Sequence, residues 1–365
     1  MRRLHLQLAK EIGLPLLATL ALLLQLLFAM QLLRGADLVF ASSTTGRDLA
    51  KMAWLLAPHF LCLAMPIAFL AGALVGLGRL AEDRELLAAA AAGLDPLWLL
   101  PVPLAIAAVL AAAGLVLGQG VEPHALAGVR SLAGEVLLRN LQAQVRPGVF
   151  SDDLTGLTVY AEQVDPVTHR WKHVMVHDDR DRAAPMLVLA QSGALHAAPD
   201  APVSLELADG DVHRAVPGGE GYSLLHFERG RLEVGLGEAF FRKSSFRAAS
   251  PELSVAELRQ AAREAPTAAR ARELLTAAAR RVALPLAPLA FALLAIPLGA
   301  GLRKGARTLG LTLAAASYGL YYVASRAGQQ WGDAGALPPF LAAQLPNLLF
   351  AAAGLALIQA SRKRA

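Results

Sequence analysis

The distribution of apolar residues constrains this chain more than any short motif does. Three long apolar stretches precede a mostly polar segment of about 160 residues, and three more follow it. Most of them hold about 20 residues, which is enough for an α-helix to cross the core of a bilayer. They cover residues 12–33, 53–78, 97–118, 282–302, 308–324 and 339–360. We therefore predict an α-helical membrane protein with six transmembrane helices and one inserted extramembrane domain.

The composition supports this prediction and argues against a nucleic-acid partner. Charged residues make up 17% of the chain, whereas soluble domains carry about 25%. The net charge is +5, but eleven Lys and Arg lie at the termini and in the second-to-third and fourth-to-fifth helix loops, against four in the other short loops. Because positive loops stay on the cytoplasmic side, we expect both termini inside and the long segment outside. The excess of basic residues therefore reflects membrane topology, and we expect no nucleic-acid partner.

The first apolar stretch and the cysteine content bear on how the chain matures. The stretch is longer than the core of a signal peptide and ends at Arg34 without an Ala-x-Ala-like cleavage site, so we expect it to remain as an anchor. Cys62, the sole cysteine, lies within the second predicted membrane helix. No intrachain disulfide can form, so the outer domain depends on its own apolar core.

The segment between the two apolar halves predicts an all-β core. Apolar and polar residues alternate in 157–161, 173–177 and 203–207, and residues 186–190 form a continuous apolar run. Such short strands, separated by turn-forming pairs, favour an antiparallel sandwich or jelly roll, here over about 144–250. The expected turns are Asp165-Pro166, Asp209-Gly210, Gly218-Gly219 and Arg229-Gly230.

Helices are expected on both flanks of this core. Residues 122–144 lead into it, and a capping-box pattern from Ser254 to Glu257 opens a helix after it. Pro266 ends that helix, and residues 267–281 continue into the fourth membrane helix. The predicted domains are therefore 1–118 and 282–365 for the two transmembrane halves and 119–281 for the inserted domain.

The chain lacks the motifs of a nucleotide hydrolase. None of its six lysines follows a glycine, as a Walker A loop requires, and no Gly-x-Ser-x-Gly elbow occurs. No acid–base or nucleophile arrangement lies near a predicted helix end. We expect no enzyme activity and no cofactor on this chain, so any transport against a gradient needs a partner that hydrolyses ATP.

One histidine cluster could suggest a metal site. His169, His173 and His177 recur every four residues and precede Asp178 and Asp179. On a strand, however, residues four apart are separated by about 13 Å, which is too far for one ion. We therefore favour a surface strand and expect no metal.

The loop between the second and third membrane helices contains a predicted amphipathic helix at about 81–92. It starts with the acidic residues Asp83 and Glu85 on either side of Arg84, continues through a run of alanines, and ends at Gly93. A small-residue helix on the cytoplasmic side can dock into a groove of a soluble partner. It can equally be a solvated connector, and the residues alone leave both possibilities open.

Several short sequence motifs together make the chain resemble the LptF/LptG permeases of the lipopolysaccharide exporter. Gly78-Arg79-Leu80, then Asp83 to Leu86 and Gly93, resembles the coupling helix of that family. Residues 147–150, followed by residues 156–160, resemble the start of the periplasmic β-jellyroll of that family. The Pro-Gly-Val-Phe sequence at 147–150 favours the LptF branch. Further resemblance lies at 273–274, 280–281, 285–286, 297–298, 337–339 and 346–347. The chain departs at Gln344 and Leu345, where the family often has an aromatic residue, and it lacks the usual Tyr upstream of Lys10-Glu11.

The resemblance implies a bacterial inner-membrane permease that works with several partners. These are an LptG-like paralogous permease, a cytoplasmic LptB-like ATPase dimer that carries ATP and Mg²⁺, an LptC-like bridge protein, and lipopolysaccharide itself. It also implies that Glu85, Arg84 and Asp83 couple the chain to the ATPase.

Lipopolysaccharide would need basic groups for its phosphates and an apolar passage for its acyl chains. Arg34 and Arg326 lie at outer ends of predicted helices and could bind phosphate, although snorkelling anchors would look the same. Inward positions of the β core such as Val159 and Leu205 could line the passage. The Gly72/Gly76, Gly114/Gly118 and Gly301/Gly305 pairs allow close helix packing, more plausibly within this chain than between subunits.

Two other functions compete with this interpretation. A different ABC permease with a periplasmic domain, of the lipoprotein-release or MacB type, usually has four membrane helices per subunit, so the helix count discriminates. A membrane sensor or scaffold would need an output domain, whereas the predicted cytoplasmic parts are short loops; co-purification of an ATPase discriminates here.

Overall fold

The computed structural model describes residues 2–34, 44–94, 96–154, 157–165, 168, 170–180, 185–198, 201–215, 222–233, 253–302 and 306–363. The chain divides into two compact units. The first comprises residues 1–30, 54–126 and 248–365, and the second comprises 31–53 and 127–247.

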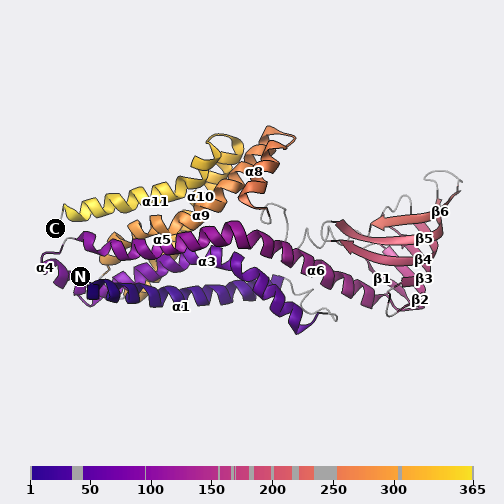
Figure 1. Cartoon of the computed structure of the whole chain (residues 1–365), viewed down its shortest axis with the longest axis horizontal. Coiled ribbons are helices and arrows are strands. Elements are labelled where there is room, and N and C mark those ends of the chain that lie inside the picture. Colours follow the sequence, from indigo (N-terminus) through magenta and orange to yellow (C-terminus); the bar gives the residue numbers. More distant parts are fainter. Residues whose placement is uncertain are drawn as a thin grey trace. The chain divides into compact units, whose positions relative to one another are not determined.

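Long helices dominate the structure (Figure 1). Five of them are long and apolar enough to cross a membrane within the described residues. In chain order the helices are α1 (Arg2–Arg34), α3 (Gly46–Glu82), α4 (Glu85–Ala91), the 3₁₀ turn η1 (Pro96–Leu99), α5 (Pro101–Val116), the π-helical turn η2 (Leu117–Val121), α6 (Glu122–Gln144), α8 (Val255–Arg263), α9 (Ala268–Ala300), α10 (Ala306–Ala334) and α11 (Pro339–Arg362).

The fifth expected membrane helix, at residues 308–324, lies within α10, which differs from the other five. At 29 residues it extends over about 44 Å, which is enough to cross a bilayer. It is less apolar than the five that qualify by composition, because Tyr, Ser, Thr and Gly interrupt its apolar residues.

The core of the first unit lies where α1, α3 and α9 meet. Phe69 and Leu74 of α3 and Phe291 of α9 are fully buried there, as is Ile12 of α1. Gly76 lets α1 approach, since a Cβ on it would lie 2.4 Å from the carbonyl oxygen of Glu11; Gly72 does the same beside Leu16. These glycines serve packing within the chain, as predicted.

The helical flanks of the β core form as expected. The Ser254 Oγ accepts a hydrogen bond from the Glu257 amide at 3.3 Å, and the Glu257 carboxylate accepts from the Ser254 amide at 2.7 Å. This reciprocal capping box starts α8. Thr267 then caps α9, which continues without a break through the polar turns into the apolar stretch.

The second unit contains one six-stranded antiparallel sheet. Its strands are β1 (Phe150–Leu154), β2 (Leu157–Val164), β3 (Arg170–Asp178), β4 (Met186–Ala198), β5 (Ala201–Ala215) and β6 (Tyr222–Glu233), and they pair in sequence order. The antiparallel all-β prediction is confirmed. Strand order is that of a meander, so the crossing connections of a jelly roll do not occur among the described strands.

The sheet is nevertheless strongly coiled. Arg180, which follows β3, donates a hydrogen bond at 2.7 Å to the carbonyl oxygen of Glu233 at the end of β6, although two strands separate β3 from β6 in the pairing order. Val159 of β2 and Leu205 of β5 belong to one buried cluster with Trp171. The concave face therefore encloses an apolar interior.

Two of the predicted turns lie inside strands instead. Asp209-Gly210 is within β5 and Arg229-Gly230 within β6. Asp209 takes the left-handed conformation with φ 53°, yet pairing resumes on both sides. A Cβ at position 210 would lie 2.3 Å from the Leu189 carbonyl, so this glycine permits close approach of a neighbouring strand.

The Asp165 turn connects β2 to β3 as expected, whereas Gly218-Gly219 lies outside the described residues.

Candidate functional site

The segment after α3 places the three residues predicted to contact an ATPase. α3 ends at Glu82, Asp83 and Arg84 form a turn, and α4 begins at Glu85. The helix expected at about 81–92 is present as the shorter α4, which starts four residues later than predicted. The reason is that Arg84 adopts φ 62°, and a residue in the left-handed region interrupts a right-handed helix. α4 ends as predicted, with Gly93 at φ 81° and the Leu94 amide bonded to the Ala89 carbonyl.

Two of these three side chains contact helices packed beside the turn. Glu85 accepts hydrogen bonds from the Gln7 side chain of α1 at 3.1 and 2.9 Å. Asp83 lies 3.7 Å from Arg79, whose guanidinium also donates to Glu11 of α1 at 3.0 Å. The side chain of Arg84 is exposed. α4 and the two chain ends lie at the same end of this unit (Figure 1).

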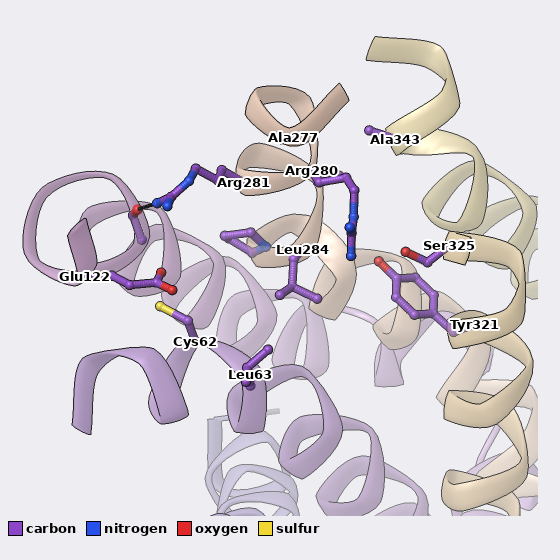
Figure 2. Close-up of a pocket in the computed structure, with 13 residues that line it drawn as sticks. Cys62, Leu63, Glu122, Ala277, Arg280, Arg281, Leu284, Tyr321, Ser325 and Ala343 are labelled. Carbon is purple, nitrogen blue, oxygen red and sulfur yellow. Dashed lines mark hydrogen bonds between the residues drawn. The ribbon is translucent and has the colours of Figure 1, made fainter. Parts of the chain in front are cut away.

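A cavity of about 260 Å³ opens elsewhere in the first unit, lined by α3, η2, α6, α9, α10 and α11. Figure 2 shows adjacent arginines of α9 diverging around it, with Arg280 directed toward Tyr321 and Arg281 toward η2. Arg281 donates to the Gly118 carbonyl at 3.0 Å, an oxygen within the π-helical turn. Glu122 lies beside Cys62 and contacts His59 at 2.7 Å.

Arg280 shares its hydrogen-bond acceptor with a second arginine. Its Nη1 lies 2.6 Å from Oε1 of Gln329, and Nη1 of Arg326 lies 3.1 Å from the same atom. Arg326 also donates to the Tyr322 hydroxyl at 3.0 Å and stacks over that ring. Across the described part of the chain, neither guanidinium has a carboxylate within ion-pair distance, although Asp333 acts on Arg280 from farther away.

The structure describes the side chain of one of the two arginines predicted to bind phosphate. Arg326 does not end a helix, because α10 continues past the apolar stretch to Ala334. The side chain of Arg34, the last residue of α1, lies outside the described part. From the sequence, Arg280 belonged to the family resemblance without a phosphate role, and Gln329 was not singled out. The Arg-Arg pair directly before an apolar stretch was the signal that could have given Arg280 that role.

A polar network joins α9, α10 and α11 beside this cavity. The Tyr321 hydroxyl donates to Oδ1 of Asn347 at 3.0 Å, and the Asn347 amide donates to the Ala283 carbonyl at 2.8 Å and to Oε1 of Gln344 at 2.7 Å. Every polar atom of the buried Asn347 amide is therefore used. Gln344, the position where the chain departs from the expected aromatic residue, supplies one of the acceptors.

The interior of the β-sheet matches the predicted inward set. Val159 and Leu205 are 0% and 1% exposed, while Thr158 and Glu206 are only partly buried. Glu206 instead pairs with Arg231 at 2.6 Å on the outer surface. The alternation read from the sequence therefore has the correct register.

The histidine cluster gains no support as a metal site. His169 lies outside the described residues, and His173 pairs with Glu162 at 2.8 Å. Among the residues that the structure describes, no group of three metal-ligating side chains converges.

Comparison with known families decides what kind of protein this is. Residues 7–360 match the family described as lipopolysaccharide export system permease LptF/LptG. The chain belongs to the LptF/LptG family. The match spans both helical halves and the inserted sheet, so the resemblance seen in the short motifs is confirmed. No curated protein matches the chain.

Membership of the LptF/LptG family makes the chain a transport permease rather than a catalytic subunit. Together with the five apolar helices found among the described residues, it also makes the chain a multi-pass inner-membrane protein. The match covers LptF and LptG jointly, so the preference for LptF stays a prediction. The alternatives of a lipoprotein-release permease and of a sensor are not favoured.

Proposed function

We propose that this chain is the permease subunit that extracts lipopolysaccharide from the inner membrane and passes it to a periplasmic bridge. The family match over residues 7–360 carries this proposal. The chain would pair with an LptG-like permease, receive energy from a cytoplasmic LptB-like ATPase that binds ATP and Mg²⁺, and deliver the lipid to an LptC-like protein. Both termini and α4 would face the cytoplasm, and the sheet would lie in the periplasm.

The exposed apolar side of α1 fits a helix that faces lipid or a second permease. From Leu17 through Leu22 to Leu26 its side chains are 58–65% exposed within the chain, whereas water-facing helix surfaces are polar. Acyl chains or another apolar helix would cover this surface.

Arg280 and Arg326 are suited to the phosphates of the lipid. Guanidinium groups bind phosphate through paired, charge-assisted hydrogen bonds, and these two share a neutral acceptor. Arg34 remains proposed for the same role. Acyl chains would then follow the apolar interior of the sheet, past Val159 and Leu205.

Glu85 is proposed as the residue through which the ATPase acts. It is an exposed carboxylate at the first position of α4, and Glu85→Lys would place a cation where a basic group of the ATPase is expected. Like charges brought together at an interface cost several kcal/mol.

A pull-down of the full chain from detergent, with partners identified by mass, tests the proposal. We expect an ATPase and a second permease with the native chain, loss of the ATPase with Glu85→Lys, and no ATP hydrolysis by the chain alone. Recovery of neither partner with the native chain would refute the assembly. Normal ATPase recovery and normal export with Glu85→Lys would refute the role of Glu85.

A further inference from the structure

The Glu85 carboxylate has a partner within the chain that no motif indicates. Nε2 of Gln7 lies 3.1 Å from one carboxylate oxygen of Glu85 and 2.9 Å from the other. Gln7 belongs to the second turn of α1, and Glu85 is the first residue of α4. One amide group therefore contacts both oxygens of an exposed side chain that would otherwise sample several rotamers.

Buried packing determines where Gln7 lies. The next residue, Leu8, is 1% exposed, and Ile12 one turn later is fully buried against α3. Glu11, four residues after Gln7 and so on the same side of α1, accepts a hydrogen bond from Arg79 of α3 at 3.0 Å. The amino-terminal turns of α1 are thus fixed to α3 by apolar and polar contacts together.

The turn between α3 and α4 brings Glu85 to this position. Arg84 at φ 62° interrupts the helix and changes the chain direction immediately before Glu85. The arrangement combines a fixed donor, Gln7, with an acceptor whose backbone is redirected toward it. Within the described residues, Gln7 is the hydrogen-bond partner of Glu85.

We propose that Gln7 is a positioning residue, which holds the Glu85 carboxylate in the orientation that a basic group of the ATPase recognises. A carboxylate offers about four lone-pair sites, so the Gln7 amide leaves acceptor capacity for a guanidinium or ammonium group. Ordering the side chain before docking removes part of the entropic cost of association. This inference rests on the proposed role of Glu85.

The test compares Gln7→Met with Leu6→Met in the full permease complex, using a separately purified LptB-type ATPase. Met keeps the length of the Gln side chain and removes the donor, and Leu6 is an exposed neighbour on α1. We expect Gln7→Met to weaken ATPase binding about fivefold, the usual effect of losing one hydrogen bond, and Leu6→Met to leave it unchanged. Native affinity in Gln7→Met would overturn the inference. If Glu85→Lys still abolished ATPase binding in that case, the proposed role of Glu85 would stand. If neither Gln7→Met nor Glu85→Lys changed ATPase binding, the proposed coupling through Glu85 would fail as well.

Two further variants separate positioning from a merely structural bond. In a Glu85→Ala background, Gln7→Met should cause no additional loss of ATPase affinity, and an additive loss would contradict the inference. The exchange Gln7→Glu with Glu85→Gln restores a hydrogen bond but removes the carboxylate from position 85. We expect native thermal stability and weak ATPase binding from it, whereas native binding would show that only the bond matters and would overturn the proposal.

Discussion

Arg280 and Arg326 donate hydrogen bonds to one and the same atom, Oε1 of Gln329, at 2.6 and 3.1 Å. A neutral amide oxygen satisfies donors but balances no charge. Two guanidinium groups held close together therefore repel each other and retain a strong attraction for an anion. Figure 2 shows Arg280 at the edge of the cavity that such an anion could reach.

Replacing Gln329 by Glu should separate stability from lipid binding. The new carboxylate would neutralise part of the charge of both arginines, so thermal unfolding in detergent should shift to higher temperature. The same carboxylate would repel a phosphate, and lipopolysaccharide affinity should fall about tenfold, as expected for the loss of one charge-assisted hydrogen bond. Gln330→Glu, an exposed neighbour, is the matched control. Equal lipid affinity in both variants would contradict a phosphate site here.

Arg84 allows the backbone and side-chain roles of the coupling turn to be distinguished. Its left-handed conformation costs an L-residue about 1 kcal/mol that glycine does not incur. Arg84→Gly should therefore keep or slightly raise the stability of the full chain, and Arg84→Val should lower it, because a β-branched side chain tolerates positive φ worse than Arg does. The affinity of the ATPase for Arg84→Gly, measured by titration, then reports the contribution of the Arg84 side chain to binding. An unchanged affinity would mean that Arg84 contributes only to the turn and not to the contact with the ATPase.

The Asn347 network should be important for holding α9, α10 and α11 together. Asn347→Leu removes the acceptor of Tyr321 and the donor to Gln344 and to the Ala283 carbonyl. The bonds to Tyr321 and to Ala283 join separate helices. At about 0.6 kcal/mol for each hydrogen bond between membrane helices, their loss should be about 1 kcal/mol. Thermal unfolding in detergent measures it, with Leu348→Ala, an exposed neighbour, as the reference. A smaller loss than in that reference would show that the network contributes little.

Stability of the β-sheet should depend on pH through Asp178. The hydrogen bond from Arg180 holds the pKa of the Asp178 carboxyl below its ordinary value. A lowered folded-state pKa means that the stabilisation is present above the ordinary pKa of about 3.9 and is lost as pH falls through the folded value. With the partial exposure of Arg180, it should amount to roughly 1 kcal/mol.

Hydrogen exchange of the strand amides in the full chain, corrected for intrinsic rates, measures this contribution. Asp178→Asn should reduce protection at about pH 6, and the difference from the native chain should shrink toward about pH 3. A difference that stayed constant over this range would mean that the ion pair does not account for it.

Local signals in the sequence predicted much of this fold, because they act within one or two turns of the chain. Ser254 with Glu257 predicted a helix start, Gly93 predicted a helix end, and the alternation around Val159 predicted which face of the sheet is buried. Each depends on neighbouring residues or on a simple period.

Contacts between distant segments could not be predicted in the same way. Gln7 meets Glu85 across 78 positions, and Arg280 meets Gln329 across 49. Only the packing of α1 on α3 and of α10 near α9 brings these partners together. The turn predicted at Asp209-Gly210 was wrong for a related reason. The pair is typical of a turn, but the close approach of a neighbouring strand at Gly210 keeps it inside β5.

Site-specific photo-crosslinking in a reconstituted system tests most directly whether this chain carries lipopolysaccharide. The complex would contain the full chain, its partner permease and the ATPase in lipopolysaccharide-bearing liposomes, with the crosslinker at one position at a time. We expect ATP-dependent labelling of the lipid from the buried positions Val159 and Leu205, and little from Thr158 or Glu206 on the other face. Equal labelling from both faces, or none with ATP and all partners present, would contradict the account of the sheet as the path of the lipid.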